Sequence, residues 1–176
     1  VDANTGTLVE ARNEIILEDV VGNLRGMGSP GTLPDIAANP PVALDMPNHR
    51  VGISGGSSVF TNADGSFTIP NGGTGAVTVT SSMLNGQWNH IDNTQGSEIS
   101  VSGNTTPPGP IDLLFNPAPS EFNTAQVNGA VQVALTHNYM TDRTSFPGLN
   151  TNIQTNVNFT SAGGITGCNA FFTTSG

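Results

Sequence analysis

Histidine side chains are the first candidates for chemistry in this chain, because imidazole is a common metal ligand and general base. The chain has three, His49, His90 and His137, and they stand far apart in the sequence. There is no H-E-x-x-H sequence, so no two histidines lie one helical turn apart to hold zinc. Scattered histidines can converge in space, but the sequence itself predicts no zinc site within this chain. We expect His137, on a predicted helix, to be hydrogen-bonded as part of the structure.

Nucleophiles and carboxylates give no stronger signal. The spacing of Asp92, Glu98 and Asp112 is not that of a marked catalytic pair. The single cysteine, Cys168, cannot form a disulfide within the chain and has no second thiol with which to bind a metal. Two interpretations of Cys168 stay open, a buried free thiol and a cysteine whose partner lies beyond residue 176.

A partial calcium-binding pattern occurs at residues 62–65, Asn-Ala-Asp-Gly. An EF-hand loop aligned on this glycine would need a ligand at Phe60 and a bidentate glutamate at Asn71, and neither is present. Asp-Gly is a strong turn dipeptide. The pattern therefore predicts a hairpin turn between strands at 57–61 and 66–69.

Composition limits the classes of partner. Acidic residues number 13 against four arginines, and the net charge is −9. Nucleic acids and anionic membranes are poor partners for such a chain, because binding to their phosphates needs basic clusters. No apolar run is long enough to span a bilayer. Abundant Gly, Pro, Asn, Ser and Thr with few charges are typical of an extracellular β-rich protein, whose signal segment would lie upstream of Val1.

The elements that must position these residues are mostly short strands. Residues 1–16 are predicted to form a strand, a turn and a second strand. An all-β module follows over 17–104, in which the Pro- and Gly-rich residues 28–41 form a long loop. Trp88, which follows an Asn-Gly turn, is expected in the core or at the edge of a sandwich. The strands are predicted at 17–24, 50–55, 57–61, 66–69, 76–80, 86–91 and 97–102.

A Pro-rich linker over 105–119, which contains most of "NTTPPGP", is expected to end this module. Ser120 can then cap a helix whose first turn holds Glu121. Apolar or small residues form two stripes at helical spacing, so the helix should be buried on two sides. One stripe holds Phe122, Ala125, Gly129, Val133 and Met140, and the other holds Val127, Val131, Leu135 and Tyr139.

The last part of the chain alternates cleanly between apolar or threonine residues and amide residues over 151–160. A glycine-rich turn over 161–167 and a strand over 168–172 follow, and the two strands are expected to pair as a hairpin. The predicted fold is therefore mainly β, with a β-sandwich followed by a small α+β piece of one buried helix and one β-hairpin.

The sequence "NAFF", residues 169–172, resembles a strand at the edge of the active-site cleft in thermolysin-like and fungalysin-like zinc metallopeptidases. The preceding "THNYMTDR" and "NIQTNVNF" agree with this resemblance. In those families the strand binds the substrate as an added β-strand. The resemblance implies that Asn169, Ala170 and Phe171 contact a peptide substrate, with Phe171 and Phe172 on opposite sides of the sheet edge.

Two further resemblances extend the pattern. The sequence "VDANTGTLVEARNEI" is similar to the closing hairpin of a metallopeptidase propeptide, and residues 53–82 look like a transthyretin-like, carboxypeptidase-regulatory-like sandwich. Together they imply a propeptide end at 1–16, a sandwich module at 17–104, a linker at 105–119 and the incomplete start of a catalytic domain at 120–176. The parent would be a secreted zinc metalloendopeptidase.

In those families the zinc helix follows "NAFF", and it is not in this chain, so this chain alone is not expected to hydrolyse peptides. Zinc is expected only in the parent protein. The expected partners are the rest of the catalytic domain and the parent's peptide substrate, together with self-association through an exposed apolar helix. Two alternatives stay open: a stand-alone secreted β-sandwich that acts in adhesion or binding, and an inhibitory pro-region that acts on a protease.

Overall fold

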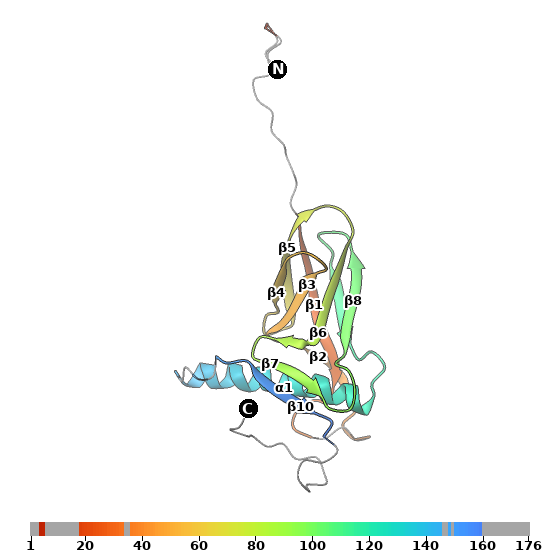
Figure 1. Ribbon diagram of the computed structural model, residues 1–176, viewed down its shortest axis with the longest axis vertical. Helices are drawn as coiled ribbons and strands as arrows, with labels where there is room; N and C mark the ends of the chain where they lie inside the picture. The colour runs from red at the N-terminus through yellow and green to blue at the C-terminus, as the bar shows by residue number, and fades with distance from the viewer. Residues whose placement is uncertain (1–3, 6–17, 34–35, 146–147, 149, 160–176) are drawn as a thin grey trace.

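Two β-sheets packed against each other form most of the computed structural model, which describes residues 4–5, 18–33, 36–145, 148 and 150–159 (Figure 1). In the first sheet the long central strand β1 (Glu18–Gly28) pairs antiparallel with β2 (Val42–Asp45) and β5 (Ser66–Gly73). On its other edge β1 pairs in parallel with β9 (Ile111–Phe115).

The second sheet has the order β4-β3-β6-β8, with all neighbours antiparallel. Its strands are β4 (Ser58–Phe60), β3 (His49–Ile53), β6 (Val77–Gly86) and β8 (Ser100–Thr105). Alternating residues from both sheets, among them Leu24, Ile69 and Val79, have no exposed surface and belong to one hydrophobic core. The expected mainly β fold, a sandwich with one helix, is confirmed.

The end of the sandwich is covered by the helix α1 (Glu121–Arg143) and by a small parallel sheet of β7 (Asn89–Asn93) and β10 (Ile153–Val157) (Figure 1). Ser120 stands at the N-cap with an extended backbone, as expected. Its side chain makes no capping hydrogen bond, but its carbonyl accepts a hydrogen bond of 2.8 Å from the N–H of Thr124.

Two strands were missing from the sequence prediction. β2 is short, and β9 lies inside the segment that was expected to be a linker. Ile111, Leu113 and Phe115 are buried on alternate positions of β9, and the carbonyl of Pro108 accepts a hydrogen bond of 2.9 Å from Val21 N–H. Prolines dominate the sequence of this segment, but its buried alternation makes β9 an integral strand of the sheet.

The Asp64-Gly65 turn is present, although it does not connect a hairpin. The carboxylate of Asp64 accepts a hydrogen bond of 3.0 Å from Ser66 N–H, and Gly65 has a φ of 75°. The flanking strands β4 and β5 belong to different sheets. The prediction of a turn was therefore correct and the prediction of a hairpin was wrong, because a turn dipeptide does not determine which strands pair across it.

Both apolar stripes of α1 make contacts in its N-terminal half. Val127 is fully buried beside Gly26 of β1, where an added Cβ would lie 2.8 Å from a Val127 methyl group. Gly129 faces Ile91 of β7 and Val157 of β10 in the same way. The prediction of a helix buried on two sides holds for this half only. Farther along α1 the exposed fractions of Leu135, Tyr139 and Met140 are 47%, 56% and 36%.

β10 alternates as expected, but within the described residues its partner is β7 of the sandwich module. Side-chain amides reinforce this pairing: Asn152 donates to the Gly86 carbonyl at 2.8 Å, and Asn158 donates to Asn93 Oδ1 at 2.7 Å. The predicted hairpin strand at 168–172 lies outside the described residues, as does the predicted hairpin at 1–16 except for Asn4 and Thr5, which lie in a turn.

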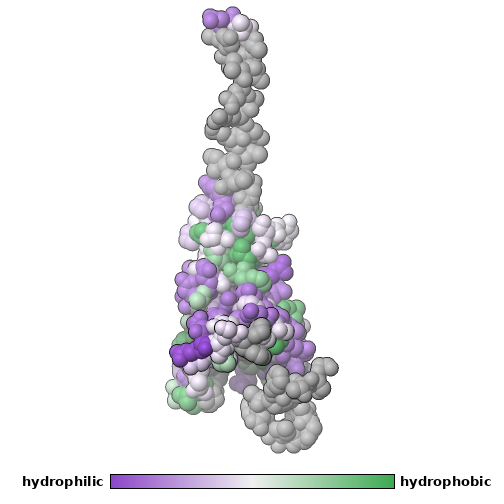
Figure 2. All heavy atoms as spheres, turned by 90° about the vertical axis from the view of Figure 1, so that its left-hand side faces the viewer, coloured by the Kyte–Doolittle hydropathy of each residue, from purple (hydrophilic) through white to green (hydrophobic). Residues whose placement is uncertain are grey.

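The surface is largely polar, with local exceptions. On the face drawn in Figure 2, hydrophobic side chains gather in a patch on the sandwich and hydrophilic side chains surround it. Among the described residues, no helix combines the length and the apolar character needed to cross a bilayer.

Candidate functional site

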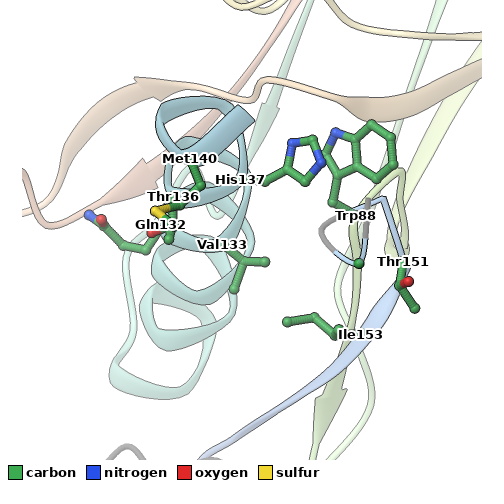
Figure 3. Close-up of a pocket in the computed structure, with 9 residues that line it drawn as sticks. Trp88, Gln132, Val133, Thr136, His137, Met140, Thr151 and Ile153 are labelled. Carbon is green, nitrogen blue, oxygen red and sulfur yellow. The ribbon is translucent and has the colours of Figure 1, made fainter. Parts of the chain in front are cut away.

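A pocket of about 500 Å³ lies between α1, the start of β10 and the loop that carries Trp88 (Figure 3). Val133 and His137 extend from α1 toward Ile153 and Trp88 on the opposite wall (Figure 3). The pocket is positioned by the parallel pairing of β10 with β7, because that pairing holds Ile153 beside the turn before β7. The described lining residues are Trp88, Gln132, Val133, Thr136, His137, Met140, Gly148, Thr151 and Ile153.

Trp88 forms one wall and is fixed from two sides. Its carbonyl accepts a hydrogen bond of 3.1 Å from Ile153 N–H, which ties it to β10. Its indole ring stacks on His137 with a centroid distance of 3.9 Å and an interplanar angle of 11°. The indole N–H is buried and has no hydrogen-bond partner among the described residues. Trp88 is half-buried at the edge of the sandwich, as the sequence predicted. Its stack with His137 joins the sandwich to α1.

His137 is held by amide groups, as the sequence analysis predicted. Its Nε2 lies 3.1 Å from Asn150 Oδ1 and its Nδ1 lies 3.3 Å from Asn138 Oδ1. These contacts and the stacked indole occupy both ring nitrogens and one ring face. Among the described residues the partners of the His137 ring are therefore two amides and one indole, which orient the ring in the pocket wall.

The other two histidines have separate environments. His49 lies in the sandwich core, with its Nε2 2.9 Å from the Ser82 carbonyl and its ring edge-on to Phe115. Burial lowers the pKa of His49 to about 4, and the hydrogen bond with Ser82 opposes this shift only in part. His90 Nδ1 lies 2.8 Å from Asn152 Oδ1. In the described part of the chain no three His, Cys, Asp or Glu side chains gather closely enough to hold a metal ion.

The carboxylates that were considered for acid–base chemistry have different hydrogen-bond or ion-pair partners. Asp92 accepts a hydrogen bond of 2.6 Å from Gln154, and Glu98 accepts one of 3.2 Å from Asn93 N–H. Asp112 lies on β9 and is 3.9 Å from Arg25.

The residues expected to bind substrate, Asn169, Ala170 and Phe171, lie outside the described residues, as does Cys168. The pocket itself was missed at the sequence level. Trp88 and His137 each carried a weak signal, a lone tryptophan after a turn and a histidine on an apolar stripe. Only the folded chain brings the two rings together.

The described walls of the pocket are mostly uncharged. Its described lining contains no Asp, Glu, Lys or Arg side chain, and its only titratable group is the stacked His137 ring. Comparisons with protein families, with curated proteins and with solved structures gave no match to this chain. Its function is therefore argued from its residues and their geometry.

Proposed function

We propose that this chain is a non-catalytic part of a secreted zinc metalloendopeptidase, and that the parent protein hydrolyses peptide bonds. In this proposal the described residues form a scaffold, and residues 169–171 contact the peptide substrate. Zinc bound elsewhere in the parent would supply an activated water. The observation that carries the proposal is the apolar surface of α1 that no described residue covers.

Several apolar side chains of α1 are exposed. Leu135 and Tyr139 are about half exposed, at 47% and 56%, and Phe122 at the other end is 51% exposed. Apolar area removed from water contributes roughly 25 cal/mol per Å², so contiguous apolar side chains are commonly covered by another part of a protein. A stand-alone sandwich gains nothing from such a helix end, whereas a catalytic lobe would use it as a packing face.

The arrangement of β10 supports the same proposal. Thr155 and Val157 face Gly129 of α1, and the amides of Asn152 and Asn158 bind to the sandwich. The helix and the strand thus pack together on the sandwich, and the sequence "NAFF" follows β10 later in the chain. In the resembling families, a strand at that place forms the edge of the substrate cleft.

One observation favours the stand-alone alternative, a secreted β-sandwich that acts in surface binding or adhesion. Val127, Ala130 and Val131 are buried against the chain's own sheets, with exposed fractions of 0%, 3% and 4%. The helix therefore packs on the sandwich with one face while it exposes another. The sequence that the gene encodes after Gly176 separates the two functions.

The test is to determine the sequence that the gene encodes after Gly176. The proposal expects an H-E-x-x-H sequence within roughly 20–40 codons, followed by a third ligand. The protein that contains it should hydrolyse an unstructured peptide, lose activity with a zinc chelator and regain it with zinc. A stop codon directly after Gly176, or an open reading frame without a metal motif, would leave the stand-alone alternative.

Within that parent protein we predict that Asn169→Ala lowers kcat/KM for a peptide by about tenfold, the value of roughly one lost hydrogen bond to the substrate. Asn156→Ala, an exposed asparagine of β10, is the matched control and should leave kcat/KM unchanged. Steady-state kinetics with one peptide measure both. Equal kcat/KM for the two variants would remove Asn169 from the substrate site.

A further inference from the structure

We propose that the pocket between Trp88, α1 and β10 binds one uncharged apolar side chain of a peptide, of the size of leucine or phenylalanine. The choice of a peptide rests on the proposed function. The pocket would be an accessory site, separate from the residues at 169–171 that are proposed to contact the substrate.

Size and wall chemistry select an apolar group. The volume of about 500 Å³ falls within the range of small-ligand pockets, roughly 300–1,000 Å³. Val133, Met140 and Ile153 supply aliphatic walls, and the Trp88 indole supplies an aromatic one. One leucine or phenylalanine side chain occupies only part of this volume, and it makes favourable contacts with these walls.

Charge selects against ionised ligands. The described lining has no Asp or Glu to pair with a cation and no Lys or Arg to pair with an anion. An ionised group that entered would lose its hydration without gaining a partner. The net charge of −9 adds a general repulsion of anions. A neutral side chain loses no hydration of a charged group, and the net charge of the protein does not repel it.

Polar groups of the lining select a peptide over a plain hydrocarbon. Thr136 and Thr151 contribute hydroxyl groups, each of which can donate and accept a hydrogen bond. A peptide backbone beside the bound side chain needs both functions. Gln132 is already used in part, because its Nε2 donates to the Gly31 carbonyl at 3.1 Å.

The position of the pocket means that a bound side chain would affect how α1 and β10 pack on the sandwich. Its walls come from the turn before β7, from α1 and from β10, so a bound side chain would contact the sandwich and the helical platform together. Binding would therefore stabilise the seating of α1 and β10 on the sandwich. Ligand sites of this kind are common where two packed units meet.

Trp88 provides a direct readout, because it is the only tryptophan of the chain. The 176-residue chain is titrated with the blocked peptide acetyl-Gly-Phe-Gly-amide, and Trp88 fluorescence is recorded. A saturable change with a dissociation constant of about 1 mM or tighter is expected for one apolar side chain. The matched peptide acetyl-Gly-Asp-Gly-amide should give no saturable change. An unchanged signal with the phenylalanine peptide, or equal binding of both peptides, would overturn the proposal.

Two substitutions on α1 locate the binding. Val133→Phe fills the pocket and should weaken binding by about tenfold or more. Leu135→Phe adds similar bulk on an exposed position outside the pocket and should leave binding unchanged. Thr136→Phe replaces Val133→Phe if the latter loses its native circular dichroism spectrum. Equal effects of the pocket variant and Leu135→Phe would refute the site.

The two proposals can fail separately. This titration needs neither zinc nor the rest of the parent, so it can succeed when the gene encodes no metal motif. Conversely, a metal motif after Gly176 together with no peptide binding here would retain the proposed function and reject the accessory site.

Discussion

At the scale of single residues, environment decides the role of each histidine more than residue type does. His49, His90 and His137 meet a backbone carbonyl, an asparagine amide and a tryptophan ring respectively. His49 is 1% exposed, and its burial lowers its pKa to about 4. The free energy of unfolding therefore depends on whether His49 is protonated.

We predict that folding stability falls as the pH is lowered from about 6.5 to 4, in part because of His49. In this window the unfolded chain binds a proton on His49 and the folded chain does not, so protonation favours unfolding. Above pH 6.5 the contribution of His49 is complete, and below about pH 4 no further loss comes from it. The shift corresponds to about 3 kcal/mol in the free energy of unfolding.

Urea unfolding at a series of pH values measures this loss. The His49→Gln variant should have a flatter pH dependence between pH 6.5 and 4, whatever its absolute stability. Val51→Ala, which shortens a buried side chain of the same strand and removes no titrating group, is the control and should keep the wild-type slope. If His49→Gln and the wild-type protein have the same slope, the buried histidine does not set the pH dependence.

At the scale of elements, α1 depends on small residues where it meets the sheets. Gly129 lies where an added Cβ would be 3.2 Å from Ile91 and from Val157, closer than ordinary van der Waals contact. Gly26 provides the same space on β1 for Val127. Helix propensity alone would favour another residue at position 129, so its glycine is explained by packing.

We predict that Gly129→Leu lowers the free energy of unfolding by about 2 kcal/mol, because overpacking forces α1 away from β10. Gly129→Ala should stay near the wild-type value, because a gain in helix propensity of up to about 1 kcal/mol opposes the tight contacts. Urea unfolding gives the free energies. Hydrogen exchange should show faster exchange of β10 amides in the leucine variant, while amides between β3 and β6 stay protected. An undisturbed β10 would contradict this account.

At the scale of the whole molecule, the sandwich is covered at one end by α1, β7 and β10, while the far half of α1 projects from it (Figure 1). The guanidinium of Arg143 lies 4.5 Å from the Tyr139 ring centroid and covers part of it. The side chain of Leu135 is 47% exposed. This end of the helix is the expected contact with a further part of a protein or with a second copy.

We predict that the isolated chain self-associates through this surface. Sedimentation velocity over a wide range of protein concentration should show reversible association, and the double substitution Leu135→Ser and Tyr139→Ser should reduce it, because it removes the apolar contact. Leu33→Ser with Leu84→Ser removes two similarly exposed leucines elsewhere and is the matched control. A chain that stays monomeric at every concentration, or a control with the same effect, would contradict the prediction.

The sequence predicted elements where the local pattern is strong. Turn residues and apolar alternation marked seven strands, six in the sandwich sheets and β7 in the small parallel sheet. Ser120 with a continuous run of helix-compatible residues marked the start of α1. β9 was missed because Pro107, Pro108 and Pro110 outweighed the alternation of Ile111, Leu113 and Phe115. The prolines favour a loop and the alternation favours a strand. Burial of the alternating residues against the sheet makes the segment a strand.

By itself the sequence determined the mainly β class, the acidic surface and the two apolar stripes of α1, because these follow from residue type and spacing along the chain. Only the tertiary structure decided that the Asp64-Gly65 turn joins two sheets, that β10 pairs in parallel with β7, and that Trp88 stacks on His137. Pairing and stacking depend on contacts between residues distant in sequence. The free energy of those contacts comes from surfaces that become neighbours only when the whole chain packs.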